Sequence, residues 1–212
     1  LPCTVRDYVF DDFNLDQREK AVAATNTAFS EIWWFYPSSS SSTNDRYVVY
    51  NYQQQAWYYG TLVRSFWMDR GIFDNPIAAG PNNFLYTQET GFDDDGSALT
   101  AYVESSQMDI GDGEQFSFIK RMIPDITFRG STAGSPSAVM TLKTRNFPGG
   151  NYLQTEDSTV TKSASSPVEQ FTDQVHVRLR GRSFAFRIES TASGVGWRLG
   201  SPRVDIRPDG RR

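Results

Sequence analysis

Short apolar and aromatic runs, separated by polar and glycine-rich segments, dominate the chain. The runs IWWFY (32–36), RYVVYNY (46–52) and AWYYGTLV (56–63) are bounded by Pro, Ser, Asn and Gln clusters, a pattern typical of β-strands. Their short polar connections predict an antiparallel meander. Further strands are predicted at 84–89, 99–105, 115–123, 138–145, 174–180, 183–190, 196–199 and 202–207.

Helical periodicity is weak throughout the chain. The best candidate, LDQREKAVAAT (15–25), reads either as two or three helical turns or as a loop that runs into a strand. The sequence therefore predicts an all-β protein of antiparallel meander sheets. Propeller-like blades are expected over residues 1–130 and a sandwich-like subdomain over 131–212, and the polar segment 151–168 is expected to be a surface excursion or an edge hairpin.

The aromatic run at 32–36 loads both faces of its strand. Because successive side chains point to opposite faces, Trp33 and Phe35 lie on one side and Trp34 and Tyr36 on the other. A stacking platform for sugars or bases needs aromatics on one open face, so burial between neighbouring sheets is favoured over a ligand platform. The serine run after the strand, Pro37 to Asp45, is expected to be an exposed connecting loop.

The clearest alternation lies near the C-terminus, in VHVRLRGRSFAFRIES (175–190). Valine, leucine, phenylalanine and isoleucine alternate there with polar residues, which predicts a hairpin with one apolar face and one arginine-rich face. The candidate interface residues are Arg178, Arg180, Arg182 and Arg187.

The net charge of −4 conceals an asymmetry. Residues 1–175 contain 12 Lys and Arg against 22 Asp and Glu, whereas residues 176–212 contain 9 Arg against 3 acids. A basic tail on an acidic body fits nucleic acid, an acidic neighbouring subunit or a second copy of the chain. The subunit interpretations are favoured because the arginines belong to a strand pattern.

Several classes of chemistry are excluded or disfavoured. The single Cys3 leaves no intrachain disulfide and no multi-cysteine zinc site, and no apolar run approaches the length of a membrane-spanning helix. The lone His176 sits at an outward strand position, and no nucleophile, metalloprotease or nucleotide-binding motif occurs. No cofactor is therefore expected.

Acidic residues offer weak alternatives. The clusters FDDDGS (92–97) and DIGDGE (109–114) lack the alternating spacing of a calcium loop, so tight turns are the favoured interpretation. A glycosidase needs two carboxyl groups across a cleft, and linear spacing does not rank the candidates. Those candidates are Glu31, Asp45, Glu104 and Asp125.

One set of segments carries a resemblance to a known family: EIWWFYPS, DRYVVYNY, AWYYGTL, RSFWMDRGIFDNPIAAG, YTQETGFDDDG, ESSQMDIGDGEQF, IKRMIPDITF and GWRLGSPRVDIRPDGRR. Together these segments resemble the C-terminal part of a family of tailed-bacteriophage proteins, the packaged-DNA stabilisation or tail hub and nozzle proteins of short-tailed phages. The resemblance spans nearly all 212 residues and is weakest over 151–170.

The resemblance implies a structural, non-enzymatic virion protein of the tail, with a β-propeller and assembly as a ring below the portal. Blade-like units are expected over 31–63 and, in part, 72–105. A closed propeller needs at least four blades, so the chain is expected to be the C-terminal portion of a longer protein or a member without the propeller.

In this interpretation the ring surrounds the channel for genome retention and ejection, and double-stranded DNA passes without sequence-specific binding. The four tail arginines would contact a neighbouring copy, the portal, an adaptor or another tail protein. Asp93, Asp94 and Asp95 would face the channel. The alternatives are a carbohydrate-binding module with Trp57, Tyr58 and Tyr59 as its platform, and a tail-associated glycosidase.

Overall fold

The computed structural model describes residues 3–109, 111, 113–155 and 157–211. The chain forms two units, Leu1–Thr90 and Gly91–Arg212. The regular secondary structure of both is almost entirely antiparallel strand, which confirms the predicted all-β class. The described helical segments are short: α1 (Arg6–Asp11) and the 3₁₀ turn η1 (Leu15–Lys20).

The ambiguous segment 15–25 is a turn that runs into a strand. The Asn14 side chain accepts a hydrogen bond from the Asp16 backbone N–H at 3.1 Å and caps η1. The chain then extends into β1 (Val22–Asn26). Leu15–Lys20 thus forms helical turns of the 3₁₀ type, whereas the second half of the segment follows the strand interpretation, because the valine, alanines and threonine after Lys20 pair with β2.

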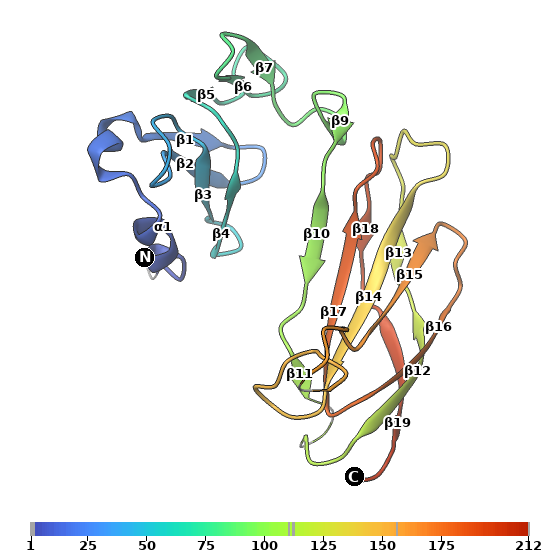
Figure 1. Cartoon of the computed structure of the whole chain (residues 1–212). Helices are drawn as coiled ribbons and strands as arrows, with labels where there is room; N and C mark the ends of the chain where they lie inside the picture. Colours follow the sequence, from blue (N-terminus) through green and yellow to red (C-terminus); the bar gives the residue numbers. More distant parts are fainter. Residues whose placement is uncertain (1–2, 110, 112, 156, 212) are drawn as a thin grey trace. The chain divides into compact units, whose positions relative to one another are not determined.

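The first sheet is a four-stranded meander in the order β1-β2-β3-β4. It adds β1 to the predicted hairpins of β2 (Glu31–Tyr36), β3 (Arg46–Asn51) and β4 (Ala56–Thr61), so the predicted meander is confirmed (Figure 1). Residues Glu31 to Tyr36 pair in continuous register with Asn51 to Arg46.

Both faces of β2 are buried. Trp33 and Phe35 join Val49 in one apolar cluster, whereas Tyr36 and Val48 form another on the opposite face, against which Trp34 packs. Buried aromatic side chains of this size contribute strongly to a core. The expectation that the aromatic run fills a core on both sides is therefore confirmed.

A small second sheet covers the first face. It comprises β5 (Phe66–Met68), β6 (Ile77–Ala79) and β7 (Leu85–Thr87) in consecutive order. The Trp67 ring stacks on Trp33 at 5.2 Å between ring centroids, and its Nε1–H donates to the Thr25 carbonyl oxygen at 3.1 Å. Two meanders thus stack face to face, as neighbouring propeller blades do, but the described residues do not close a propeller.

The second unit contains two larger sheets, one in the order β10-β17-β14-β15, with β11 also on β17, and one in the order β16-β12-β19. Short pairs β8-β9 and β13-β18 lie outside them. The strands are β8 (Asp93–Asp94), β9 (Ser97–Ala98), β10 (Ala101–Glu104), β11 (Met108–Asp109), β12 (Ser117–Ile123), β13 (Ile126–Thr127), β14 (Ser137–Arg145), β15 (Ser163–Glu169), β16 (Val175–Gly181), β17 (Ser183–Ser190), β18 (Arg198–Leu199) and β19 (Arg203–Pro208).

The main pairings are nested along the chain. β14 pairs with β15, β12 with β16 around them, and β10 with β17 outermost. Nested antiparallel pairs divided between two sheets are the pattern of jelly-roll sandwiches. One apolar cluster takes side chains from both sheets, including Ile119 and Leu179 on one side and Leu142 and Ile188 on the other, so the sheets pack face to face as a sandwich.

The segment 175–190 does not form the predicted hairpin. β16 pairs with β12, whereas β17 pairs with β14 and β10, so the two strands lie in opposite sheets. Their apolar residues do face one core, but from opposite sides. The chain crosses at Gly181, where a Cβ atom would lie 2.6 Å from the Thr144 Cβ. Only glycine allows this close approach.

The boundary between the units also differs from the predicted division into 1–130 and 131–212. It falls at Thr90 and Gly91, because β10 and β12 pair with β17 and β16 and therefore belong to the sandwich. The excursion at 151–168 is a loop with an isolated Leu153–Thr161 bridge that leads into the edge strand β15. Within the described ranges, no helix is long and apolar enough to cross a membrane.

Trp67 is expected to hold the two stacked sheets together. Trp67→Ala removes a buried ring from the Trp33 and Phe35 cluster, and should lower the free energy of unfolding of the N-terminal unit by about 3–5 kcal/mol. Urea denaturation followed by tryptophan fluorescence measures this. Ile72→Ala is the matched control because Ile72 lies in the same unit and is 95% exposed, and equal losses in both variants would contradict the assignment.

Candidate functional site

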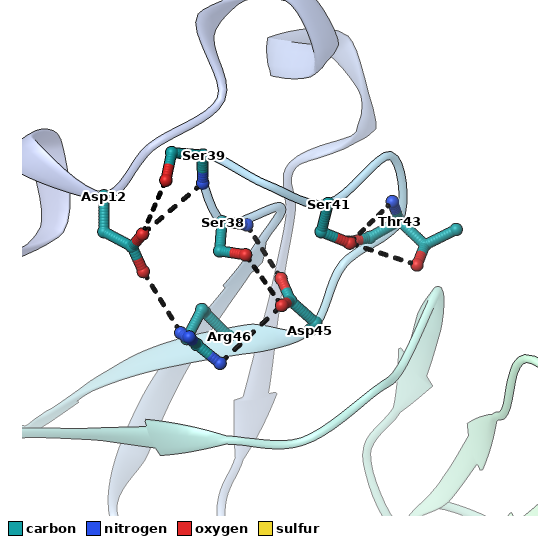
Figure 2. Close-up of polar contacts among 7 residues, drawn as sticks. All are labelled: Asp12, Ser38, Ser39, Ser41, Thr43, Asp45 and Arg46. Atoms are coloured by element: carbon teal, nitrogen blue, oxygen red, sulfur yellow. Dashed lines mark hydrogen bonds and ion pairs between the residues drawn. The ribbon is translucent and has the colours of Figure 1, made fainter.

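The serine-rich loop between β2 and β3 is folded back onto the sheet, although the sequence suggested an exposed connection. Ser38 is only 1% exposed. Its backbone N–H and its hydroxyl donate to the two carboxylate oxygens of Asp45, at 2.7 and 2.8 Å. The start of the loop is thereby closed onto its end (Figure 2).

Asp12 anchors the same loop from the N-terminal segment. Its carboxylate accepts hydrogen bonds from the Ser39 hydroxyl at 3.0 Å and from the Arg46 Nε at 3.1 Å (Figure 2). The bond from Ser39, together with Arg46, lowers the pKa of Asp12 below its usual value. Arg46 also approaches Asp45 at 3.6 Å. Hydroxyl and guanidinium donors therefore satisfy both carboxylates, which points to a structural role.

The first residue of the interior strand β2, Glu31, is a buried carboxylate. It accepts a hydrogen bond from the Trp33 Nε1–H at 2.8 Å and another from the Tyr58 hydroxyl. Burial and the hydrogen bond to Glu31 raise the pKa of Tyr58. Tyr58 thus remains a hydrogen-bond donor, and Glu31 is held by two structural donors.

The candidate glycosidase acids occupy separate networks. Glu31 and Asp45 are bound as described above, Glu104 accepts from Lys143 and Arg187 at 2.8 and 3.0 Å, and Asp125 accepts from the Ser201 backbone N–H at 2.7 Å. Each carboxylate therefore has a structural partner, and these contacts do not bring two of the four acids together.

The proposed sugar platform divides between two faces of β4. Trp57 packs on Trp34 and Tyr50 at centroid distances of 5.7 and 4.7 Å, and Tyr59 stacks on Tyr8 at 3.9 Å. Tyr58 instead reaches Glu31. The three aromatics do not form one open surface, which disfavours this alternative.

The four candidate interface arginines are not equivalent. Arg187 lies on β17, where it pairs with Glu104 and Glu189 at 3.0 and 2.6 Å. Arg180 is bound to Asp209, and Arg182 donates to the Arg211 carbonyl oxygen at 3.3 Å.

These contacts give three of the arginines partners within their own unit. Arg180 and Arg182 also place their guanidinium groups over the Phe116 ring, at 4.0 and 4.8 Å from its centroid. Arg178, by contrast, is exposed on the outward face of β16.

Arg178 belongs to a wider basic face that the sequence did not reveal. β12 lies between β16 and β19, and the outward residues of these strands share one surface (Figure 1). The segment PRVDIR (202–207) alternates between polar and apolar residues in the sequence. Only the pairing of β19 with β12 shows that its arginines belong to the same sheet as β16. The exposed cations of this face, which we call the basic face, are Lys120, Arg178, Arg203 and Arg207.

The acidic segment Asp93–Asp95 forms the tight turn of β8 and β9. The Asp93 carboxylate accepts a hydrogen bond from the Gly194 backbone N–H at 2.5 Å, whereas Asp94 and Asp95 are exposed. Asp95 has φ +48°, which an aspartate tolerates in a turn. The other predicted acidic turn, DIGDGE, includes Ile110 and Asp112, which lie outside the described residues.

Neither a metal centre nor a histidine site emerges from the part of the chain that the structure describes. It contains no group of three or more His, Cys, Asp or Glu residues able to hold a metal ion. His176 is exposed on β16 beside Arg121. A comparison with protein-family models finds no match, and a comparison with curated proteins finds none either.

Removing the Asp45 carboxylate should loosen the serine loop. Asp45→Ala leaves the buried Ser38 N–H and hydroxyl without an acceptor, so the free energy of unfolding of the N-terminal unit should fall by about 1–3 kcal/mol. Chemical denaturation measures the change. The exposed Asp74 provides the control Asp74→Ala, and a loss no larger than in that control would refute the closure of the loop by Asp45.

Glu104 should make the stability of the sandwich pH-dependent. Hydrogen bonds from Lys143 and Arg187 lower its pKa below the usual 4.5, so the unfolded chain binds the proton more tightly and stability rises with pH through this window. Glu104→Gln should cost about 0.5–1 kcal/mol near neutral pH.

The cost should disappear as the pH falls below 4.5 through the lowered pKa of Glu104. Urea midpoints between pH 3 and 7 give the difference. Glu114→Gln, at a largely exposed side chain, is the control. A difference between wild type and Glu104→Gln that is constant across this range would contradict the role of the carboxylate.

Proposed function

We propose that the chain is a structural component of a phage tail, in the hub, nozzle or adaptor ring. It forms a homo-oligomeric ring that contributes to the DNA channel and serves genome retention and ejection. The resemblance of its segments to tail hub and nozzle proteins supports this role and a location in the virion tail. Its flanking partners are the portal, an adaptor or other tail proteins.

The basic face is the observation that carries a ring contact. Lys120, Arg178, Arg203 and Arg207 are exposed on one three-stranded sheet, while Asp94 and Asp95 are exposed on a turn of the same unit. When each copy carries two different complementary surfaces, neighbours associate head to tail, and such contacts close rings. Arg180, Arg182 and Arg187 instead contact acids, a carbonyl oxygen or an aromatic ring of their own unit.

The acidic turn has a second role in the proposal. The phosphate backbone attracts cations strongly, so exposed carboxylates on a channel wall repel DNA and let it slide. In every copy the turn lies at the rim of the ring contact beside the channel, where its carboxylates approach the neighbour's basic face and also border the DNA path. The four candidate acids each accept hydrogen bonds from structural partners in the chain, which supports a mechanical role over a hydrolytic one. They are Glu31, Asp45, Glu104 and Asp125.

Charge reversal on the basic face should prevent assembly without unfolding the protein. Arg178→Glu places an acid on the face, and the ring should dissociate into folded monomers as measured by light scattering and electron microscopy. Arg129→Glu is the control, because Arg129 is exposed in the same unit but lies outside the strands of this face. Intact rings in the Arg178→Glu variant would refute this contact.

A further inference from the structure

The two stacked sheets of the N-terminal unit are also joined at one end by polar side chains. Asn26, the last residue of β1, is wholly buried, and its Nδ2–H donates to the Glu89 Oε1 at 3.1 Å. Glu89 follows β7, so this hydrogen bond links the second sheet to the first. The Asn26 Oδ1 is also buried, but it has no hydrogen-bond partner among the described residues. An unpartnered buried acceptor is unfavourable, and an ionised Glu89 has no proton to donate to it.

Glu89 has an uncommon backbone conformation. Its φ is +57°, in the left-handed region that residues with a Cβ atom seldom adopt. The residue as a whole is exposed, yet its carboxyl end reaches the buried Asn26 amide. The chain thus directs an acidic side chain inward just before the boundary between the two units, which falls after Thr90.

A second carboxylate, that of Glu31, borders the same amide. Glu31 and Asn26 are cross-strand partners on β2 and β1, so their side chains lie next to each other on one face. Glu31 is only 8% exposed, and its two oxygens accept hydrogen bonds from Trp33 and Tyr58. Burial and the charge of Glu31 raise the pKa of Glu89 above its usual 4.5, although the hydrogen bond from Asn26 opposes them.

The other ionisable groups around this pair of carboxyls lie on β3, β4 and the second sheet. Burial and the nearby carboxylates raise the pKa of Tyr47 and of Tyr58, so both hydroxyls stay neutral where carboxyl groups titrate. Arg64 places its guanidinium over the Tyr86 ring of β7, at 4.7 Å from the centroid. Although burial opposes it, hydrogen bonds from the turn after β1 lower the pKa of Asp69.

We propose that Glu89 takes up a proton from water and, as the neutral acid, joins the two sheets through Asn26, a contact that we call the Glu89 latch. The acid accepts from the Asn26 Nδ2–H and donates its own O–H to the Asn26 Oδ1. Two hydrogen bonds then replace one, and the buried acceptor is satisfied. Loss of the proton removes the second bond and leaves two carboxylates beside one amide, which opens the latch. The inference concerns the N-terminal unit by itself and does not depend on the proposed ring.

The Glu89 latch should be closed in acid and open at higher pH. The folded chain binds this proton more tightly than the unfolded chain does. The contribution of Glu89 to stability is therefore complete below pH 4.5 and is lost as the pH rises through the raised pKa of Glu89. This direction is opposite to the one predicted for Glu104. For each unit by which the pKa is raised, the equilibrium between closed and open latch shifts about tenfold.

Glu89→Gln tests the latch because glutamine mimics the protonated acid. Its amide accepts from Asn26 and donates to it, but does not ionise. Urea midpoints of the N-terminal unit, followed by tryptophan fluorescence between pH 3 and 8, should be nearly equal in wild type and variant at pH 3. At pH 8 the variant should be the more stable protein. Glu19→Gln, at an exposed residue of the same unit, is the control and should keep the pH dependence of the wild type.

Hydrogen exchange locates the opening. The Gln88 N–H, next to the latch, donates to the Pro76 carbonyl oxygen at 2.8 Å. The Gly80 N–H donates to the Phe84 carbonyl oxygen at the other end of the β6–β7 hairpin. After correction for intrinsic exchange, protection of the Gln88 N–H should fall about tenfold per unit of raised pKa as Glu89 ionises. It should stay constant in Glu89→Gln, and protection of the Gly80 N–H should not change in either protein.

An NMR titration of the Glu89 carboxyl carbon needs no variant. A midpoint above 4.5 supports the Glu89 latch, and a midpoint at or below 4.5 overturns it. A Glu89→Gln protein that is less stable than the wild type at pH 8, or that has the same pH dependence, also overturns it. Each measurement is made on the single folded chain, so failure of the latch leaves the proposed ring intact. Absence of rings, in turn, leaves the latch intact.

Discussion

A strand with large aromatic side chains on both faces must be covered on both faces. β2 imposes this constraint on the whole N-terminal unit. Trp33 and Phe35 are buried under Trp67 of the second sheet, whereas Tyr36 packs on the other side with Val48 and residues beside α1. The layers on both sides of β2 follow from the need to remove these rings from water.

The sequence was informative where structure depends on local alternation. The aromatic run predicted a buried meander, and the alternation in 175–190 identified the residues that face the core. Pairing partners were not predictable, because each strand's apolar pattern shows which face is buried and not which strand lies beside it. For this reason the hairpin at Gly181 and the boundary at residue 130 were wrong.

The candidate site shows the same limit. The four candidate arginines share a segment of the sequence, but the crossover at Gly181 puts Arg187 on the other sheet. Three of the four contact acids or an aromatic ring of the same chain, namely Arg180, Arg182 and Arg187. The basic face instead gathers exposed cations from three strands that are far apart in the chain. Asp45 illustrates a second limit, since its role in closing the serine loop depends on the fold of the loop itself.

The nested pairing of the sandwich also has a consequence for how it forms. The β14–β15 pair closes the loop between Lys143 and Ser163, whereas the β10–β17 pair joins Ala101 to Ser190. Loop closure costs more entropy as the enclosed chain lengthens, but less when inner pairs already hold the chain together. The sandwich therefore assembles most readily from its centre outward. The pairs β10–β17 and β12–β19 enclose the longest stretches of chain, so β10 and β19 are expected to dock after the inner strands.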